Sequence, residues 1–311
     1  MSGQIRTVTG DVDPAVLGVT LGHEHLFTRP AERLQDGGDM VLDDEDRAVA
    51  ELELFQRAGG GALVEVTTPE FGRDPLALRR ISERADVHVI STTGHASAEY
   101  WSGVIDVDAM TEDDLVAEMV TDLVTGMTDT GVRSGIIKAG TSYEVVLAAE
   151  ERVLRAAARA QRETGAPITT HTSAGTMARE QADILLDAGA DPCHVCLGHL
   201  DRRLDFDIHR GLAEDGFFLG YDCVSKDWYE PDARRVEHIV RLFEAGLGAH
   251  ICLSGDLARR SQLVSWGGGP GYTYIPWRLA PWLRRAGLGD DELRALLVDN
   301  PARLLTWGPR A

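Results

Sequence analysis

The residues of this chain best suited to chemistry are His23 and His25, which flank Glu24 at the end of the largely apolar run 19–21. Successive side chains of a β-strand point to opposite faces, so the two imidazoles share one face and Glu24 points away. Two neutral imidazoles at one strand end form half of a site for a divalent metal. Because a His-x-His sequence arises easily by chance in a chain with 10 His, this interpretation depends on how the other strands end.

Short apolar segments alternate with amphipathic segments along the whole chain. We expect strands at residues 19–25, 62–67, 87–93, 135–138, 168–171, 194–199, 217–221 and 250–254. Helices are expected at 44–58, 74–84, 112–129, 144–164, 176–188 and 231–245. This α/β pattern predicts a (β/α)8 TIM barrel, because an open sheet usually has fewer strands. No linker divides the chain, so we expect one domain over 1–311, with helices in 276–306 packing on the barrel.

Residues able to bind metal follow the ends of five of these strands. All strands of such a barrel run parallel, so their carboxyl ends meet at one rim. Each histidine taken alone is more often structural than a ligand, but their shared position predicts a metal site. The residues expected at this rim are His23, His25, Lys138, His171, His199 and Asp256.

Lys138 is unusual in this group, because an ammonium is no metal ligand and is costly to bury beside cations. Burial and positive neighbours favour its neutral amine. A neutral amine can take up CO₂ to form a carbamate, which resembles a carboxylate and is able to bridge two metals. The alternative is a lysine whose head reaches solvent or pairs with an acid.

These motifs resemble those of the phosphotriesterase family within the amidohydrolase superfamily, on the branch of the lactonases and phosphotriesterase homology proteins. The resemblance runs in order from about residue 6 to 306. It rests on TLGHEHL at 20–26, IKAGTSY at 137–143, THT at 170–172, GHLD at 198–201, SGD at 254–256 and NPARLL at 300–305.

The resemblance implies a hydrolase with two divalent metal ions, often zinc. His23 and His25 would bind the buried ion, and His171 and His199 the more exposed one. Carboxylated Lys138 and a hydroxide would bridge the ions, and the hydroxide would attack the substrate. Asp256 would complete the buried site and act as the catalytic residue that accepts the proton.

The substrate is predicted to be a lactone or a related carboxylic ester. Lys226 and Arg259 resemble residues that bind phosphate in the phospho-furanose-lactone branch, which would imply a phosphorylated sugar lactone. Gln262 departs from that branch, which tends to carry a tyrosine there, and both cations could instead pair with Asp222, Asp227 or other acids. Two other functions stay open, an organophosphate triesterase and a catalytically silent barrel that binds ligands.

Aromatic residues after the third expected strand are candidates for contact with the substrate. Family members line the pocket there with aromatic side chains, which makes Tyr100 and Trp101 the expected contacts, together with His95. Packing in the core or in a loop is the alternative for each of them.

Composition limits the partners of this chain. With 31 Lys+Arg against 50 Asp+Glu the net charge is -19, which argues against nucleic acid and against anionic membrane surfaces. We expect no signal peptide and no membrane span. The 4 Cys are too few for a disulfide framework, which favours the cytoplasm, and Cys193 and Cys196 are expected to pack rather than to do redox chemistry. Dimers are common in the family, so the resemblance allows a homodimer, although the sequence itself carries no signal of an interface.

Overall fold

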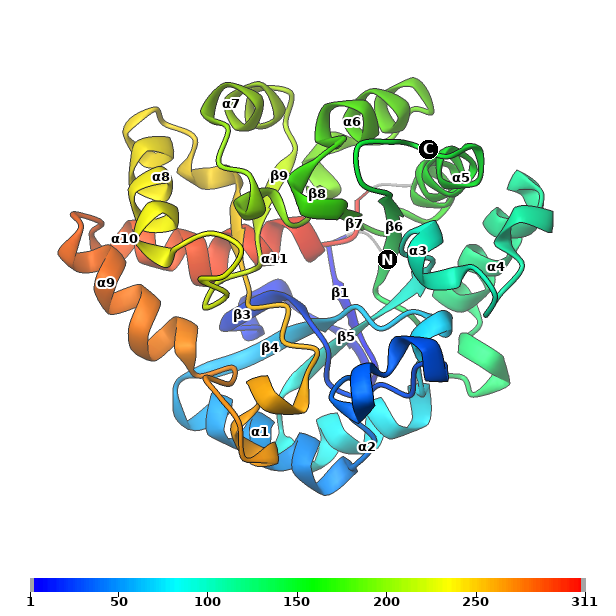
Figure 1. The fold of residues 1–311 in the computed structure, drawn as a ribbon, viewed down its shortest axis with the longest axis horizontal. Coiled ribbons are helices and arrows are strands. Elements are labelled where there is room, and N and C mark those ends of the chain that lie inside the picture. The colour runs from blue at the N-terminus through cyan, green and yellow to red at the C-terminus, as the bar shows by residue number, and fades with distance from the viewer. Residues whose placement is uncertain (1–2, 309–311) are drawn as a thin grey trace.

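Eight parallel strands form a nearly closed barrel in the computed structural model, which describes residues 3–308. Helices form a ring around the strands (Figure 1), which confirms the predicted TIM barrel as a single domain. Each strand pairs in parallel with the next along the chain. The strands are β3 (Val19–Glu24), β4 (Gly60–Glu65), β5 (His88–Gly94), β6 (Ile136–Thr141), β7 (Ile168–Thr172), β8 (Val195–Leu197), β9 (Phe218–Tyr221) and β10 (Ile251–Leu253).

Glu24 links the first and last strands of the barrel. Its buried carboxylate accepts hydrogen bonds from Ser254 Oγ at 2.7 Å, Gly255 N at 2.7 Å and Leu257 N at 2.8 Å. The backbone N–H of Asp256 donates to the carbonyl of His23 at 3.1 Å. These bonds join the end of β3 to the segment after β10, so Glu24 has the structural role that its place between two histidines suggested.

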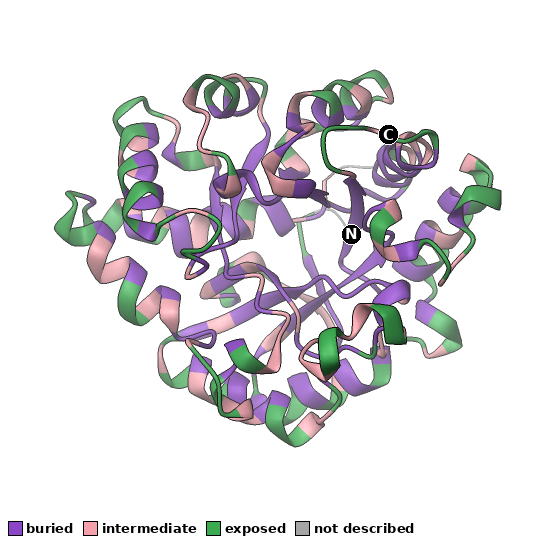
Figure 2. Cartoon of the chain, in the orientation of Figure 1, coloured by how far each residue is buried: buried purple, intermediate pink, exposed green. Residues whose placement is uncertain are grey.

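The helices between the strands bury one face against the barrel and expose the other (Figure 2). In α5 (Ala148–Thr164) the apolar stripe of Val153, Leu154, Ala157 and Ala160 is fully buried. The main helices are α1 (Glu45–Arg57), α2 (Pro75–Ala85), α3 (Ala98–Trp101), α4 (Glu112–Val124), α5 (Ala148–Thr164), α6 (Ala178–Asp187), α7 (Phe206–Glu214) and α8 (Asp232–Glu244).

Several boundaries differ from the expected ones. The helix expected over 112–129 ends at Val124, because Gly126 adopts a φ of 134° and approaches Gly131 so closely that a side chain would clash. The helix expected from 144 begins at Ala148, and α7 was not among the predicted helices. A hairpin of β1 (Ile5–Thr7) and β2 (Gly10–Val12) was also missed, since three-residue strands are too short to show a period.

The chain ends with helices α9 (Ala280–Arg285), α10 (Asp290–Arg294) and α11 (Asn300–Leu305). Asn300 Nδ2 donates to the carbonyls of Gly248 at 2.9 Å and Ile251 at 2.8 Å, which ties α11 to the start of β10. The expected domain limits, residues 1 and 311, lie outside the described residues. Among those described, no helix is long and apolar enough to cross a membrane.

Candidate metal centre

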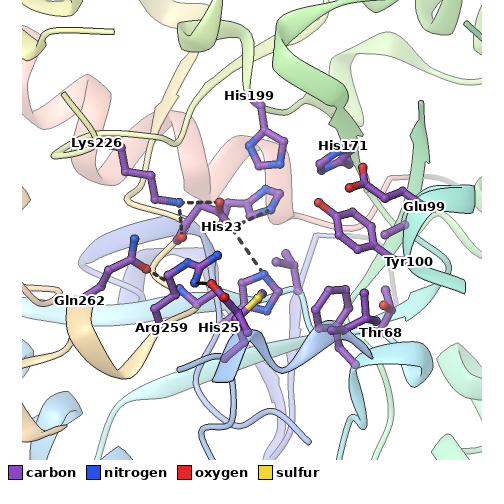
Figure 3. Close-up of a pocket in the computed structure, with 18 of the residues that line it drawn as sticks. His23, His25, Thr68, Glu99, Tyr100, His171, His199, Lys226, Arg259 and Gln262 are labelled. Atoms are coloured by element: carbon purple, nitrogen blue, oxygen red, sulfur yellow. Dashed lines mark hydrogen bonds and ion pairs between the residues drawn. The ribbon is translucent and has the colours of Figure 1, made fainter. Parts of the chain in front are cut away.

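A cavity of about 610 Å³ opens at the carboxyl ends of the strands. Figure 3 shows the rings of the four histidines facing one space, with Tyr100 pointing toward His171. Every residue expected at the rim lines this cavity: His23, His25, Lys138, His171, His199 and Asp256. The structure therefore brings together side chains from the carboxyl ends of five strands and the residues that follow those ends.

The histidines and Asp256 are close enough to share a cation. His23, His25 and Asp256 each offer an atom within 4.8 Å of the others, and Asp256 Oδ1 lies 3.4 Å from His25 Nε2. The ring of His199 lies 4.7 Å from the ring of His23 and 4.6 Å from that of His171. This arrangement of imidazole nitrogens with a carboxylate is the donor chemistry that suits zinc-like ions.

The protonation states of His23, His171 and Asp256 agree with metal binding, which requires neutral imidazoles and an ionised carboxylate. Burial lowers the pKa of His23 to about 3, and burial also lowers the pKa of His171 well below its ordinary value. Burial opposes ionisation of Asp256, but Lys226 and the histidines outweigh it and hold its pKa well below the usual range.

Lys138 is 3% exposed, and its Nζ lies 3.1 Å from Nε2 of His23. Burial lowers the pKa of Lys138 to about 8. Within residues 3–308 no carboxylate lies within ion-pair distance of this amine. A buried lysine that faces imidazoles without a carboxylate partner loses its proton more readily than an exposed lysine, which is compatible with the carbamate that the sequence suggested.

Further polar residues orient the histidines. Asp222 Oδ1 accepts hydrogen bonds from the backbone N of His199 at 2.8 Å and from its Nδ1 at 2.7 Å, while Oδ2 lies 3.2 Å from Nδ1 of His23. His25 Nδ1 lies 2.9 Å from Thr67 Oγ1. Asp222 was missed as a site residue: it had been considered only as a partner of Lys226 or Arg259. Its place directly after β9 was the available signal.

Two residues at the rim of the barrel have unusual backbone conformations. His199 and Asp256 adopt φ values of 60° and 47°, in the left-handed region that residues other than glycine rarely enter. Such conformations are uncommon and concentrate at functional sites. Eight other non-glycine residues of the described chain share this region, so the strain accompanies the site but does not by itself identify it.

The two aromatic residues expected to contact the substrate lie in different places, one in the cavity wall and one in the core. Tyr100 lines the cavity, with its ring 5.1 Å from Phe71 and 5.4 Å from His171. Trp101 does not line it, and the expectation that it contacts substrate is wrong. The short helix α3 directs its indole into the core, where it is 0% exposed, beside His95, which is itself buried against Glu70.

Lys226 and Arg259 line the cavity, but both are engaged in ion pairs. Lys226 Nζ lies 2.7 Å from Asp256 Oδ2. Arg259 pairs with Asp36 and lies 3.6 Å from Asp39. The partners of these cations are therefore acids other than Asp222 and Asp227. Cavity residues that the sequence did not suggest include Arg33, Phe71, Arg202, Trp228 and Tyr229.

Comparison with known proteins identifies relatives along the whole chain. A family model described as the phosphotriesterase family matches residues 3–305. An N-acetyltaurine hydrolase of Dictyostelium discoideum is 33% identical and each chain covers 98% of the other. A phospho-furanose lactonase of Mycoplasmopsis synoviae is 30% identical, over 97% of this chain and 91% of the relative. The crystal structure of a lactonase from Listeria monocytogenes has a TM-score of 0.94 at 33% identity, over 98% of this chain and 100% of that one.

Proposed function

This chain belongs to the phosphotriesterase family and is a metal-dependent hydrolase of ester bonds, and we propose that its substrate is a lactone or a related carboxylic ester. The observation that carries the proposal is the convergence of four histidines, a buried lysine and Asp256 on one cavity. Relatives named as lactonases support the lactone as substrate.

We assign His23 and His25 to one metal ion and His171 and His199 to a second, with Asp256 on the first. Zinc is the ion we propose, because imidazole and carboxylate donors suit it. Lys138 would join the ions as a carbamate, formed when its neutral Nζ attacks CO₂ and loses a proton. When bound, such a pair of ions lowers the pKa of a bridging water to supply hydroxide and polarises the scissile carbonyl.

The residues of the chain then have separate tasks. Asp256 would accept the proton of the attacking water and pass it to the leaving oxygen. Tyr100 and Phe71 form an aromatic wall between His25 and His171, against which the body of the substrate would pack. Lys226 and Arg259 would bind the phosphate of a phosphorylated sugar lactone only by exchanging their present carboxylate partners.

The test is a lactone screen, with and without phosphate on the sugar, on protein reconstituted with zinc. We expect about two metals per chain by elemental analysis, turnover of lactones above that of an aryl phosphotriester, and loss of turnover with chelator or with His199→Ala. Full turnover by metal-free protein would contradict the metal-dependent mechanism. Absence of any turnover would favour a binding protein.

A second candidate is hydrolysis of an amide whose other end carries an anion, as in N-acetyltaurine. Two relatives are named for that substrate, and an amide carbonyl can be attacked in the same way as a lactone carbonyl. The observation that favours this candidate is Arg202, a cavity cation without a carboxylate partner among residues 3–308. N-acetyltaurine therefore belongs in the same screen.

A further inference from the structure

The lysine and arginine side chains that line the cavity differ in whether the protein itself supplies partners for their charged groups. Lys226 and Arg259 hold ion pairs with carboxylates. Arg33 donates to the backbone carbonyls of Glu99 and Tyr100. These cations have partners before any substrate arrives.

Arg202 is different. Its guanidinium carbon lies 4.0 Å above the centre of the Tyr229 ring, and in residues 3–308 no carboxylate pairs with it. A guanidinium stacked on an aromatic face keeps its N–H groups in the plane, where they can bind the two oxygens of an anion. The stacking also reduces the freedom that an arginine would lose on binding.

The backbone of Arg202 lies next to His199, and its side chain lines the same cavity as the histidines. Arg202 ends the short turn Leu200–Arg202, directly after His199, and its backbone N–H donates to the His199 carbonyl at 3.2 Å. Tyr229 comes from the segment between β9 and α8, and both residues line the cavity. The cavity carboxylates are Asp36, Asp256 and Glu99, of which the first two are already paired.

We infer that Arg202, stacked on Tyr229, binds an oxyanion group of the substrate while the scissile carbonyl lies at the histidines. The inference rests on the proposed function and narrows it to substrates with a carboxylate, sulfonate or phosphate at one end. It assigns recognition of the anion to Arg202, on the turn after β8, and not to Lys226 and Arg259, which the sequence suggested.

The test measures binding without turnover. The probes are two ketones without a hydrolysable bond: 3-oxocyclopentane-1-carboxylate, and the uncharged 3-methylcyclopentanone. Calorimetry on zinc-reconstituted wild type should show preference for the carboxylate. Arg202→Gln should weaken carboxylate binding at least about tenfold and leave the binding of 3-methylcyclopentanone unchanged, because it removes only a charge-assisted contact. Arg202→Lys should lie between, since it keeps the charge without the fork.

Arg203→Gln is the matched control, because Arg203 is the exposed neighbour outside the cavity lining, and it should bind both ketones as wild type does. Equal affinity of wild type and Arg202→Gln for the carboxylate, or no preference for it in wild type, would overturn the inference. Binding is measured on ketones that are not hydrolysed, so it does not depend on turnover. If the protein hydrolyses no lactone but Arg202→Gln weakens carboxylate binding, the proposed function is wrong and the role of Arg202 stands. If the protein hydrolyses lactones but Arg202→Gln binds the carboxylate as wild type does, the proposed function stands and the role of Arg202 is wrong.

Discussion

Asp222 accepts two hydrogen bonds from His199 through one oxygen, at 2.8 Å from the backbone N and 2.7 Å from Nδ1. Its other oxygen lies 3.2 Å from Nδ1 of His23. Because Asp222 occupies the Nδ1 side of both rings, their Nε2 atoms are left for the cavity. One residue after β9 thus orients imidazoles from two other parts of the barrel.

Asp222→Asn should therefore weaken metal binding, because a neutral amide no longer supports both rings. Loss of a carboxylate behind a ligating histidine typically costs about 10–100-fold in metal affinity or activity. Competition with a chelator measures the affinity, and excess zinc should restore part of the turnover. Asp207→Asn, which changes an exposed carboxylate on α7, is the control. Unchanged metal affinity in Asp222→Asn would show that His199 and His23 need no such support.

Lys138→Met should remove the paired metal site while leaving the barrel folded. Met fills much of the space of the buried lysine, so the change removes the amine and little packing. We expect elemental analysis to show fewer than about two metals per chain, and turnover to be lost. Lys138→Ala should regain part of its turnover when short carboxylic acids replace the carbamate. Wild-type metal content in Lys138→Met would refute the bridging role.

The sequence predicted the rim because two simple rules determine it. Strand periodicity places His23 and His25 on one face, and parallel strands bring residues as distant as Lys138 and Asp256 to the same end of the barrel. Neither rule depends on how individual side chains pack, so this part of the prediction did not require the tertiary structure.

Partner choice could not be predicted in the same way. Asp222 contacts histidines 23 and about 200 positions away along the chain, and Arg259 pairs with Asp36 across a similar separation. Nothing local in the sequence distinguishes these carboxylates from others near strand ends. The opposite positions of Tyr100 and Trp101 depend on the orientation of the four-residue helix α3, which is too short to show a helical period.

Tyr100 and Trp101 should therefore respond differently to mutation. Trp101→Ala should lower the free energy of unfolding by about 3–5 kcal/mol, because it leaves a large hole in the core. Tyr100→Leu should leave stability within about 1 kcal/mol and reduce kcat/KM roughly fivefold through loss of aromatic contact. Urea unfolding and steady-state kinetics measure the two effects. A Trp101→Phe variant that folds normally but loses turnover as Tyr100→Leu does would contradict the placement of Trp101.

His209 should make the stability of the protein fall in mild acid. It is 1% exposed, lies 2.8 Å from Tyr221 Oη, and faces the ring of His238 at 5.1 Å. Burial, aided by His238 and opposed by Asp205, lowers its pKa to about 3. The unfolded chain takes up a proton near the ordinary pKa of 6.5, whereas the folded protein does not, so stability decreases as pH falls through that range.

Between about pH 7.5 and about pH 5.5, the uptake of a proton by His209 in the unfolded chain should lower the free energy of unfolding by about 1 kcal/mol. In His209→Gln the loss over that interval should be smaller by the same amount, since no imidazole titrates there. Tyr221→Phe is the control: it removes the hydroxyl but keeps the buried imidazole, so its pH dependence should match wild type. Urea unfolding at constant zinc concentration measures all three proteins. If His209→Gln kept the wild-type pH dependence, His209 would not be the group that causes this loss of stability, and the prediction would be wrong.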